Sequence, residues 1–270
     1  MTIHIFCFSP TGTTLRIAEG IASGMNSVCE IHNLTYAPET DILVSDDCFA
    51  IIAAPVYGGK MAPAAKERMA AIKGSGTPCA VVAVYGNRSF ENAIADMADF
   101  AGAAGFRTIA AGAFIGEHSY STPATPIAVG RPDKEDISDA HRFGCLIASK
   151  ISILDFSEPD IMSLRPLPDP ESALNNFRTF VAGYQQEQMK NPKKLTPVTD
   201  TTRCNRCGVC ADACPTSAIA GDYTTVDPDT CIKCCACVKA CPEGARTLAS
   251  PFAPVLSANF NTRKSPCWIL

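Results

Sequence analysis

The chain has 270 residues, of which 47% are hydrophobic and 19% are charged, so one large or two unequal folded domains are expected and no apolar run reaches the length of a membrane span. Fifteen cysteines, without the basic segment and cleavage site of a signal peptide, are more typical of metal ligands and free thiols in a reducing compartment than of disulfides, which predicts a cytoplasmic protein. The formal net charge is −4, and the basic excess of residues 191–270 disappears once metal-bound thiolates are counted, so nothing indicates nucleic-acid binding.

Short apolar runs separated by helix-like stretches fill residues 3–155. The runs predict buried strands at Ile3–Phe8, Cys29–Leu34, Cys48–Ala54, Cys79–Tyr85 and Arg107–Ile115. Helices are expected at Thr13–Gly24, Met61–Lys73, Ser89–Ala104 and Asp133–Leu154, whereas the polar connection Leu34–Cys48 is the weakest. Strands joined by crossover helices predict an α/β fold with a parallel sheet covered on both faces.

The segment after the first strand reads Ser-Pro-Thr-Gly-Thr-Thr over residues 9–14 and opens the first helix. Hydroxyls and backbone N–H groups at the positive end of a helix dipole can hold a phosphate. The segment lacks both the P-loop and the dinucleotide-fold glycine patterns. Taken alone, it is equally consistent with a simple helix cap.

Two further segments follow the third and fourth predicted strands. Pro55-Val56-Tyr57-Gly58-Gly59 offers an aromatic ring and flexible backbone, and Tyr85-Gly86-Asn87-Arg88 lies one strand further on. In a sheet of order 2-1-3-4-5, all three segments lie at the carboxyl ends of the strands around the switch point, where ligands bind.

These loops make residues 1–157 resemble the flavodoxins, and the resemblance implies a five-stranded doubly wound parallel sheet of order 2-1-3-4-5 that binds FMN. It places the phosphate on Ser9, Thr11, Gly12, Thr13 and Thr14. It places the flavin ring against Pro55, Val56, Tyr57, Gly58, Gly59, Tyr85, Gly86 and Asn87. Tyr57 is either the stacking residue or a packed turn residue, and Arg88 either neutralises charge on the cofactor or faces solvent.

Residues 158–202 are expected to form a linker with a bridging helix, because four prolines lie between Pro159 and Pro170 and a helical pattern follows at Ala173–Lys190. The cysteine-rich unit is expected at 203–248, and a tail over 249–270 is expected to pack back on the body.

Two cysteine runs carry the strongest signal in the chain. Residues 204–215 and 231–242 both fit C-x2-C-x2-C-x3-C-P, the pattern in which the fourth cysteine ligates the cluster held by the other run. A pair of zinc sites would not need the third cysteine of each run or the repeated ending. We therefore assign two [4Fe–4S] clusters, the first to Cys204, Cys207, Cys210 and Cys241, and the second to Cys231, Cys234, Cys237 and Cys214. Cys235 stands where the first run has Gly208 and is expected not to be a ligand.

The cysteine-rich unit resembles the ferredoxins with two [4Fe–4S] clusters, which implies a small α+β domain and one-electron transfer. The whole chain resembles the flavodoxin–ferredoxin fusion proteins. In such a protein the segment that begins Glu117-His118-Ser119 would cover the flavin edge, and His118 would be either a proton donor to reduced flavin or a structural residue.

Three functions remain open at this point. The first is electron transfer between the clusters and FMN, which would convert between one-electron and two-electron carriers, with a ferredoxin or a reductase as partner. The second is an FMN-dependent reductase of a quinone, a nitro compound or dioxygen, supplied through the clusters. The third is a redox sensor. The sequence specifies neither the direction of electron flow nor the oligomeric state.

Overall fold

The computed structural model describes residues 1–37 and 42–270, so part of the predicted connection Leu34–Cys48 lies outside the described residues. The chain divides into two compact units. The sheet unit comprises residues 1–117, 130–167 and 263–270, and the cysteine unit comprises residues 118–129 and 168–262. Residues 118–129, in the loop after the fifth predicted strand, therefore belong to the cysteine unit, while the last eight residues belong to the sheet unit.

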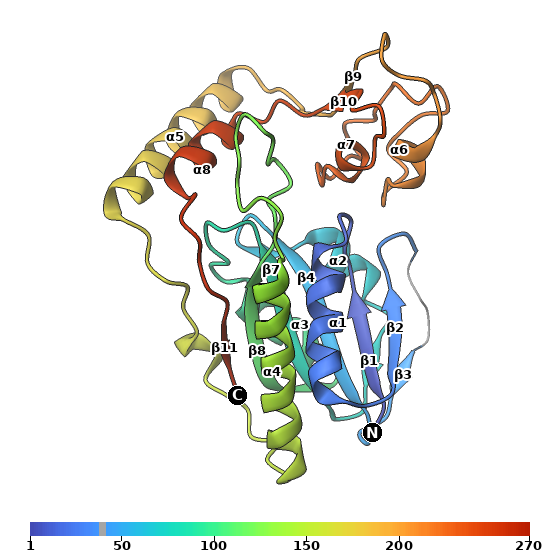
Figure 1. Cartoon of the computed structure of the whole chain (residues 1–270), viewed down its shortest axis with the longest axis vertical. Coiled ribbons are helices and arrows are strands. Elements are labelled where there is room, and N and C mark those ends of the chain that lie inside the picture. Colours follow the sequence, from blue (N-terminus) through green and yellow to red (C-terminus); the bar gives the residue numbers. More distant parts are fainter. Residues whose placement is uncertain (38–41) are drawn as a thin grey trace. The chain divides into compact units, whose positions relative to one another are not determined.

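Five parallel strands form the centre of the sheet unit (Figure 1). In spatial order they are β2 (Cys29–Asn33), β1 (Ile3–Cys7), β4 (Phe49–Tyr57), β7 (Thr77–Tyr85) and β8 (Phe106–Ile115). If these five parallel strands are numbered 1 to 5 along the chain, their spatial order is 2-1-3-4-5, which confirms the predicted flavodoxin-like fold class. β4, β7 and β8 are almost wholly buried, as strands of a sheet covered on both faces should be.

The sheet is mixed rather than purely parallel, which corrects the five-stranded description. β11 (Cys267–Ile269) pairs antiparallel with β8, and β5 (Lys60–Met61) pairs antiparallel with the end of β4. β3 (Leu43–Val44) and β6 (Lys73–Gly74) form a separate parallel pair. The Trp268 ring of β11 stacks on Phe114 and Phe143 at centroid distances of 6.1 and 5.6 Å. The last residues of the expected tail therefore form an additional edge strand.

The long helices α1 (Thr13–Met25) and α4 (Lys134–Ser152) pack against each other and share one hydrophobic core with the sheet. Glycines allow their backbones to touch, because a Cβ on Gly144 would lie 1.9 Å from the Ile21 carbonyl oxygen. Asp133 caps the start of α4 in a capping box. Its carboxylate accepts from the Asp136 N–H, and the Asp136 carboxylate accepts from the Asp133 N–H.

The helices α2 (Pro63–Arg68) and α3 (Ala93–Ala103) follow β5 and β7. Both are shorter than the sequence predicts, because residues 57–61 form a hairpin and Phe90–Asn92 form a turn before α3. Ile52 and Phe6 of the sheet lie with Met69 and Phe100 around a small apolar gap. The two pairs of helices therefore enclose the central strands, as a doubly wound fold requires.

The cysteine unit has a small apolar core of its own, formed by Ile127, Ala173, Leu256 and Phe260. Its helices α5 (Glu171–Lys190) and α8 (Phe252–Asn259) contact each other. The cysteine runs contain α6 (Val209–Asp212) and α7 (Ala236–Lys239), and β9 (Val198–Thr199) pairs with β10 (Arg246–Thr247). The turn η1 (Ile161–Ser163) belongs to the sheet unit. Across the described ranges 1–37 and 42–270, no helix is both long and apolar enough to cross a membrane.

Candidate functional site

Two cysteine-lined cavities lie in the cysteine unit. One is lined by Cys204, Cys207 and Cys210 of the first run together with Cys241 of the second. The other is lined by Cys231, Cys234 and Cys237 of the second run together with Cys214 of the first, and Cys235 lines it as well. Each cavity thus brings the first three motif cysteines of one run together with the fourth of the other, and the second cavity contains Cys235 as a fifth thiol.

The two runs adopt matching local structures. Gly208 and Cys235 occupy equivalent positions before α6 and α7, and both have left-handed backbone, with φ of 82° and 61°. The fourth cysteines also match: Cys214 Sγ accepts from the Ala218 N–H at 3.2 Å, and Cys241 Sγ accepts from the Ala245 N–H at 3.3 Å. The two similar sequences therefore adopt the same backbone conformation and form the same hydrogen bond to the fourth cysteine.

The chemistry of the donor set fits iron–sulfur clusters. Burial raises the pKa of Cys234 to about 12 and also raises the pKa of Cys231 and Cys237, so these thiols would stay protonated without a positive partner. Iron supplies that charge and binds the thiolates. All fifteen cysteines lie in the described part of the chain and none is in a disulfide.

Arg246 is a buried cation at the cysteine sites, and no local sequence pattern identifies it. Its side chain is 3% exposed, and Nη1 donates to Cys210 Sγ at 3.4 Å and to the Tyr223 carbonyl at 2.9 Å. Its charge also lowers the pKa of Cys237, against the larger opposing effect of burial. Within residues 1–37 and 42–270, its Nε and Nη2 have no hydrogen-bond partner. A buried guanidinium with spare donors beside thiol groups suits an anionic cluster.

The loop between β1 and α1 is rich in hydroxyls. Ser9 and Thr14 are buried, whereas Thr11, Gly12 and Thr13 are partly exposed. The Ser9 N–H donates to Thr35 Oγ1 at 2.8 Å, and Ser9 Oγ accepts from the Leu15 N–H at 3.0 Å. Thr35 is thus a second supporting hydroxyl, which sequence reasoning missed because it lies 26 positions away.

Gly12 gives this loop its shape. Its φ of 79° lies in the left-handed region, a Cβ there would meet nothing within 4 Å, and it precedes the first residue of α1. Gly12, at the N-cap position, has no side chain to cap this helix, and Ser9 Oγ already accepts from the Leu15 N–H of the first turn. The open space beside Gly12 at the start of α1 is a fit for the phosphate that the sequence predicts.

The second predicted loop is a strand end and a hairpin, which corrects the boundary of the third strand. β4 runs through Pro55 and Val56 to Tyr57, which faces Lys60 of β5. Gly58 and Gly59 form the turn with φ of 60° and 78°, the combination that a two-residue hairpin of this hand requires. A Cβ on Gly59 would collide with the Glu91 carboxylate, whereas one on Gly58 would be in open space.

The third predicted loop lies beside the other two, because β1, β4 and β7 are adjacent and parallel. Tyr85 is 3% exposed and packs edge-on against Phe90, so it belongs to the core rather than to an exposed loop. Asn87 is buried with φ of 67°, and Gly86 is partly exposed. Arg88 forms an ion pair with Glu91.

Lys264 supports this third loop and was also missed from the sequence. It is 5% exposed, and its Nζ donates to the Arg88 carbonyl at 2.6 Å. The contact spans 176 positions of the chain, so no local pattern reveals it. The end of the chain therefore holds a segment predicted to line the flavin.

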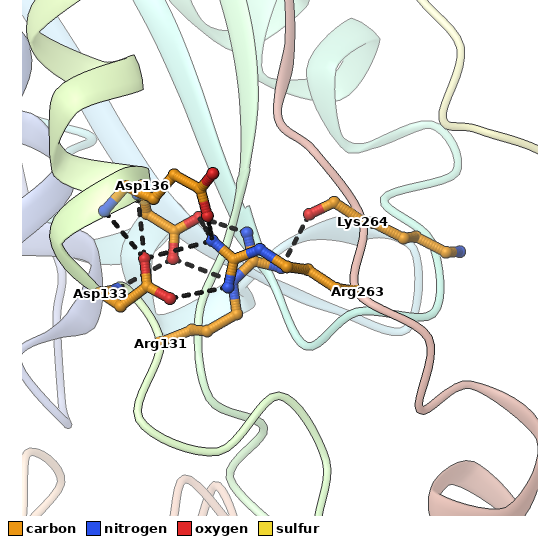
Figure 2. Close-up of polar contacts among 6 residues, drawn as sticks. Arg131, Asp133, Asp136, Arg263 and Lys264 are labelled. Carbon is orange, nitrogen blue, oxygen red and sulfur yellow. Dashed lines mark hydrogen bonds and ion pairs between the residues drawn. The ribbon is translucent and has the colours of Figure 1, made fainter.

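The return of the chain to the sheet unit is fixed by the ionic cluster in Figure 2. Arg131 is buried and forms a two-pronged ion pair with Asp136, and its Nη1 donates to the Lys264 carbonyl at 2.8 Å. Arg263 pairs with Asp133 at 2.7 Å and holds the pKa of that carboxyl well below its usual range. The residues just before β11 are thus tied to the start of α4.

The segment from Glu117 to Ser119 divides between the two units. Glu117 stays in the sheet unit, where its N–H donates to the Arg131 carbonyl and its carboxylate accepts from the Gly130 N–H. His118 and the partly exposed Ser119 belong to the cysteine unit. His118 Nδ1 accepts from the Tyr120 N–H at 3.0 Å. Its role as a proton donor stays a prediction.

Tyr120 connects this loop with the second run of cysteines. Burial raises its pKa to about 12, and the thiolate charges of Cys235, Cys231 and Cys234 contribute in the same direction, as does Tyr184. Tyr120 thus lies in the electrostatic environment of the cysteines of the second run, within the same compact unit.

Comparison with protein families finds a match in the cysteine unit. Residues 197–220 and 224–247 match the 4Fe-4S binding domain family. No curated protein matches the chain. Among solved structures, a flavodoxin from the domain Archaea has 17% identity and a TM-score of 0.39, covering 56% of this chain and 99% of its own.

Two other solved structures overlap the chain to a similar extent. The flavodoxin of Streptococcus pneumonia TIGR4 has 20% identity and a TM-score of 0.39 over 56% of this chain and 99% of its own. A flavone reductase has 10% identity and a TM-score of 0.41 over 59% of this chain and 66% of its own. From its own strand order and its matched cysteine runs, the chain combines a flavodoxin-like α/β sheet with a C-terminal 4Fe–4S binding domain.

Proposed function

We propose that the protein transfers electrons between two [4Fe–4S] clusters and one FMN, and so connects one-electron carriers with a two-electron carrier. The two cavities carry the proposal, because each is lined by the first three motif cysteines of one run and the fourth of the other, with Cys235 as an additional thiol in the second. FMN exchanges one or two electrons and each cluster exchanges one.

The sheet unit supports the flavin part of the proposal. The proposed phosphate ligands Ser9, Thr11, Gly12, Thr13 and Thr14 follow β1. The proposed ring contacts lie at the ends of the two neighbouring parallel strands, with the exposed Gly58 and the partly exposed Tyr57 on the hairpin. Ligands bind at such a position in open α/β sheets.

Arg246 would stabilise the clusters in the proposed arrangement. The Arg246 guanidinium offsets part of the negative charge that eight thiolates and two reduced clusters bring into a small unit. Hydrogen bonds to cluster-ligand sulfur stabilise the more negative, reduced state, so Arg246 keeps the clusters reducible. The unpaired thiols are in keeping with a reducing, cytoplasmic location.

Anaerobic reconstitution tests the cofactor content directly. The purified chain is incubated with iron, sulfide and FMN under reducing conditions, desalted, and analysed for metal, sulfide and flavin. The proposal predicts about eight iron and eight sulfide atoms and one FMN per chain. A chain that retains about four iron atoms, or that binds no flavin, contradicts it.

A further inference from the structure

A group of three possible metal ligands lies on the strands β1 and β2, and none of the three belongs to the proposed flavin loops or cysteine runs. It consists of His4, Glu30 and His32. The parallel register places His4 opposite Glu30 and Phe6 opposite His32. Since side chains alternate along a strand, His4 and Phe6 share a face with Glu30 and His32.

The ligand atoms form a compact triangle. His4 Nδ1 lies 3.1 Å from His32 Nε2 and 3.4 Å from Glu30 Oε2, and His32 Nε2 lies 4.0 Å from the same oxygen. A tetrahedral zinc ion with bonds of about 2.0–2.2 Å needs its ligand atoms about 3.3–3.6 Å apart. A hydrogen bond between the two imidazoles would explain the first distance but would not require the carboxylate to face both rings.

The surroundings hold the rings in place before any ion binds. The Phe6 ring is 1% exposed and stacks on His32 at 4.6 Å, and the two histidine rings stack at 5.4 Å. Both histidine side chains are 16% exposed, whereas Glu30 is 59% exposed. The site therefore has two fixed nitrogen ligands, one carboxylate that can adjust, and access from solvent.

We propose that His4, Glu30 and His32 bind one divalent transition-metal ion, for which Zn²⁺ is the best match. Two imidazole nitrogens and one carboxylate oxygen are ligands that zinc prefers, and a water molecule completes the coordination. The ion joins two neighbouring strands, and β2 lies at the edge of the sheet. Zinc binding therefore stabilises the attachment of that edge strand.

The test uses the full chain loaded with FMN and iron–sulfur clusters, so that the cluster ligands are occupied. It is dialysed anaerobically against buffered Zn²⁺ and analysed for bound zinc. We expect one zinc ion per chain, and at least a tenfold loss of affinity in His4→Gln, His32→Gln and Glu30→Gln, because even indirect partners of a zinc ligand contribute that much. His141→Gln is the matched control, since the exposed His141 lies on α4 beside Cys145.

Two readouts decide the result. X-ray absorption at the zinc edge should show nitrogen and oxygen near about 2.0–2.1 Å and no sulfur shell near about 2.3 Å. Glu30→Gln keeps both imidazoles and changes only an exposed side chain, so it serves if a histidine variant folds poorly. Unchanged zinc affinity in Glu30→Gln, a sulfur shell, or loss of zinc in His141→Gln would overturn the proposal.

Discussion

Nη1 of Arg246 lies 3.4 Å from Sγ of Cys210, and Arg246 lines the same cavity as the four cysteines of the first proposed cluster. This relationship gives the proposed clusters a fixed positive charge. Solvent and salt screen a charge buried inside the protein much less than they screen a charge on the surface.

Replacing Arg246 with Gln should make the cluster potentials more negative. The variant loses a buried positive charge and a hydrogen bond to a ligand sulfur, so adding an electron becomes harder. A shift of several tens of millivolts is expected, where about 59 mV corresponds to a tenfold change for one electron. Potentiometric titration followed by electron paramagnetic resonance measures it. Arg178→Gln, which removes an exposed charge from α5, is the control and should leave the potentials unchanged.

Cysteine variants test the crossed assignment. Cys214→Ser should destabilise the cluster of the second run, although Cys214 belongs to the first. Cys235→Gly should retain all the iron, because it restores the residue that the first run has at the equivalent left-handed position. Iron analysis and the paramagnetic resonance spectrum of each variant check this. Iron loss from Cys235→Gly equal to that from Cys214→Ser would refute the assignment.

Thr11→Val and Thr13→Val test the phosphate loop. Each removes a partly exposed hydroxyl beside the open N-terminus of α1. FMN affinity should fall by about tenfold per variant, corresponding to about 1.4 kcal/mol for a hydrogen bond to a charged group. Riboflavin, which has no phosphate, is the matched ligand. Fluorescence titration should show its affinity unchanged, and an equal loss for both ligands would place the phosphate elsewhere.

Asp136 and Asp133 provide a matched pair for the ionic cluster of Figure 2. The Asp136 carboxylate is 1% exposed and pairs with the buried Arg131, so Asp136→Asn leaves an uncompensated charge and should lower the free energy of unfolding by about 3–5 kcal/mol. Asp133→Asn affects a partly exposed pair and keeps a residue suited to capping, so about 1 kcal/mol or less is expected. Urea unfolding of the loaded protein measures both. Equal losses would argue against a structural role for the buried pair.

The sequence predicts features that depend on neighbouring residues. The central strands are continuous apolar runs, and the cysteine spacing within each run is local, so the fold class and the two cavities could be anticipated. β11 has only three residues, and its pairing with β8 joins Trp268 to Gly112, far away in the chain. Nothing in the local pattern of such a short segment indicates that pairing.

The residues that were missed depend on burial and long-range contact. Arg246 and Lys264 look like ordinary surface charges in the sequence, yet they are 3% and 5% exposed. Tyr85 ends an apolar run, and its position at the end of the predicted strand suggests a loop residue that lines the flavin. Its side chain is instead buried in the core. His4 and His32 become neighbours only through the strand register. Tertiary packing decides each of these cases.

Transfer of electrons between the clusters and the flavin is the central claim, and anaerobic stopped-flow spectroscopy with a reductant offered to the clusters tests it most directly. Reduced ferredoxin is mixed with the loaded protein, and the cluster and flavin absorbances are followed separately. The account predicts that the clusters are reduced first and the flavin follows, and that flavin reduction is lost in Cys234→Ser but kept in Cys235→Gly. Flavin reduction that is equally fast in Cys234→Ser, or that NADH alone produces, would contradict it.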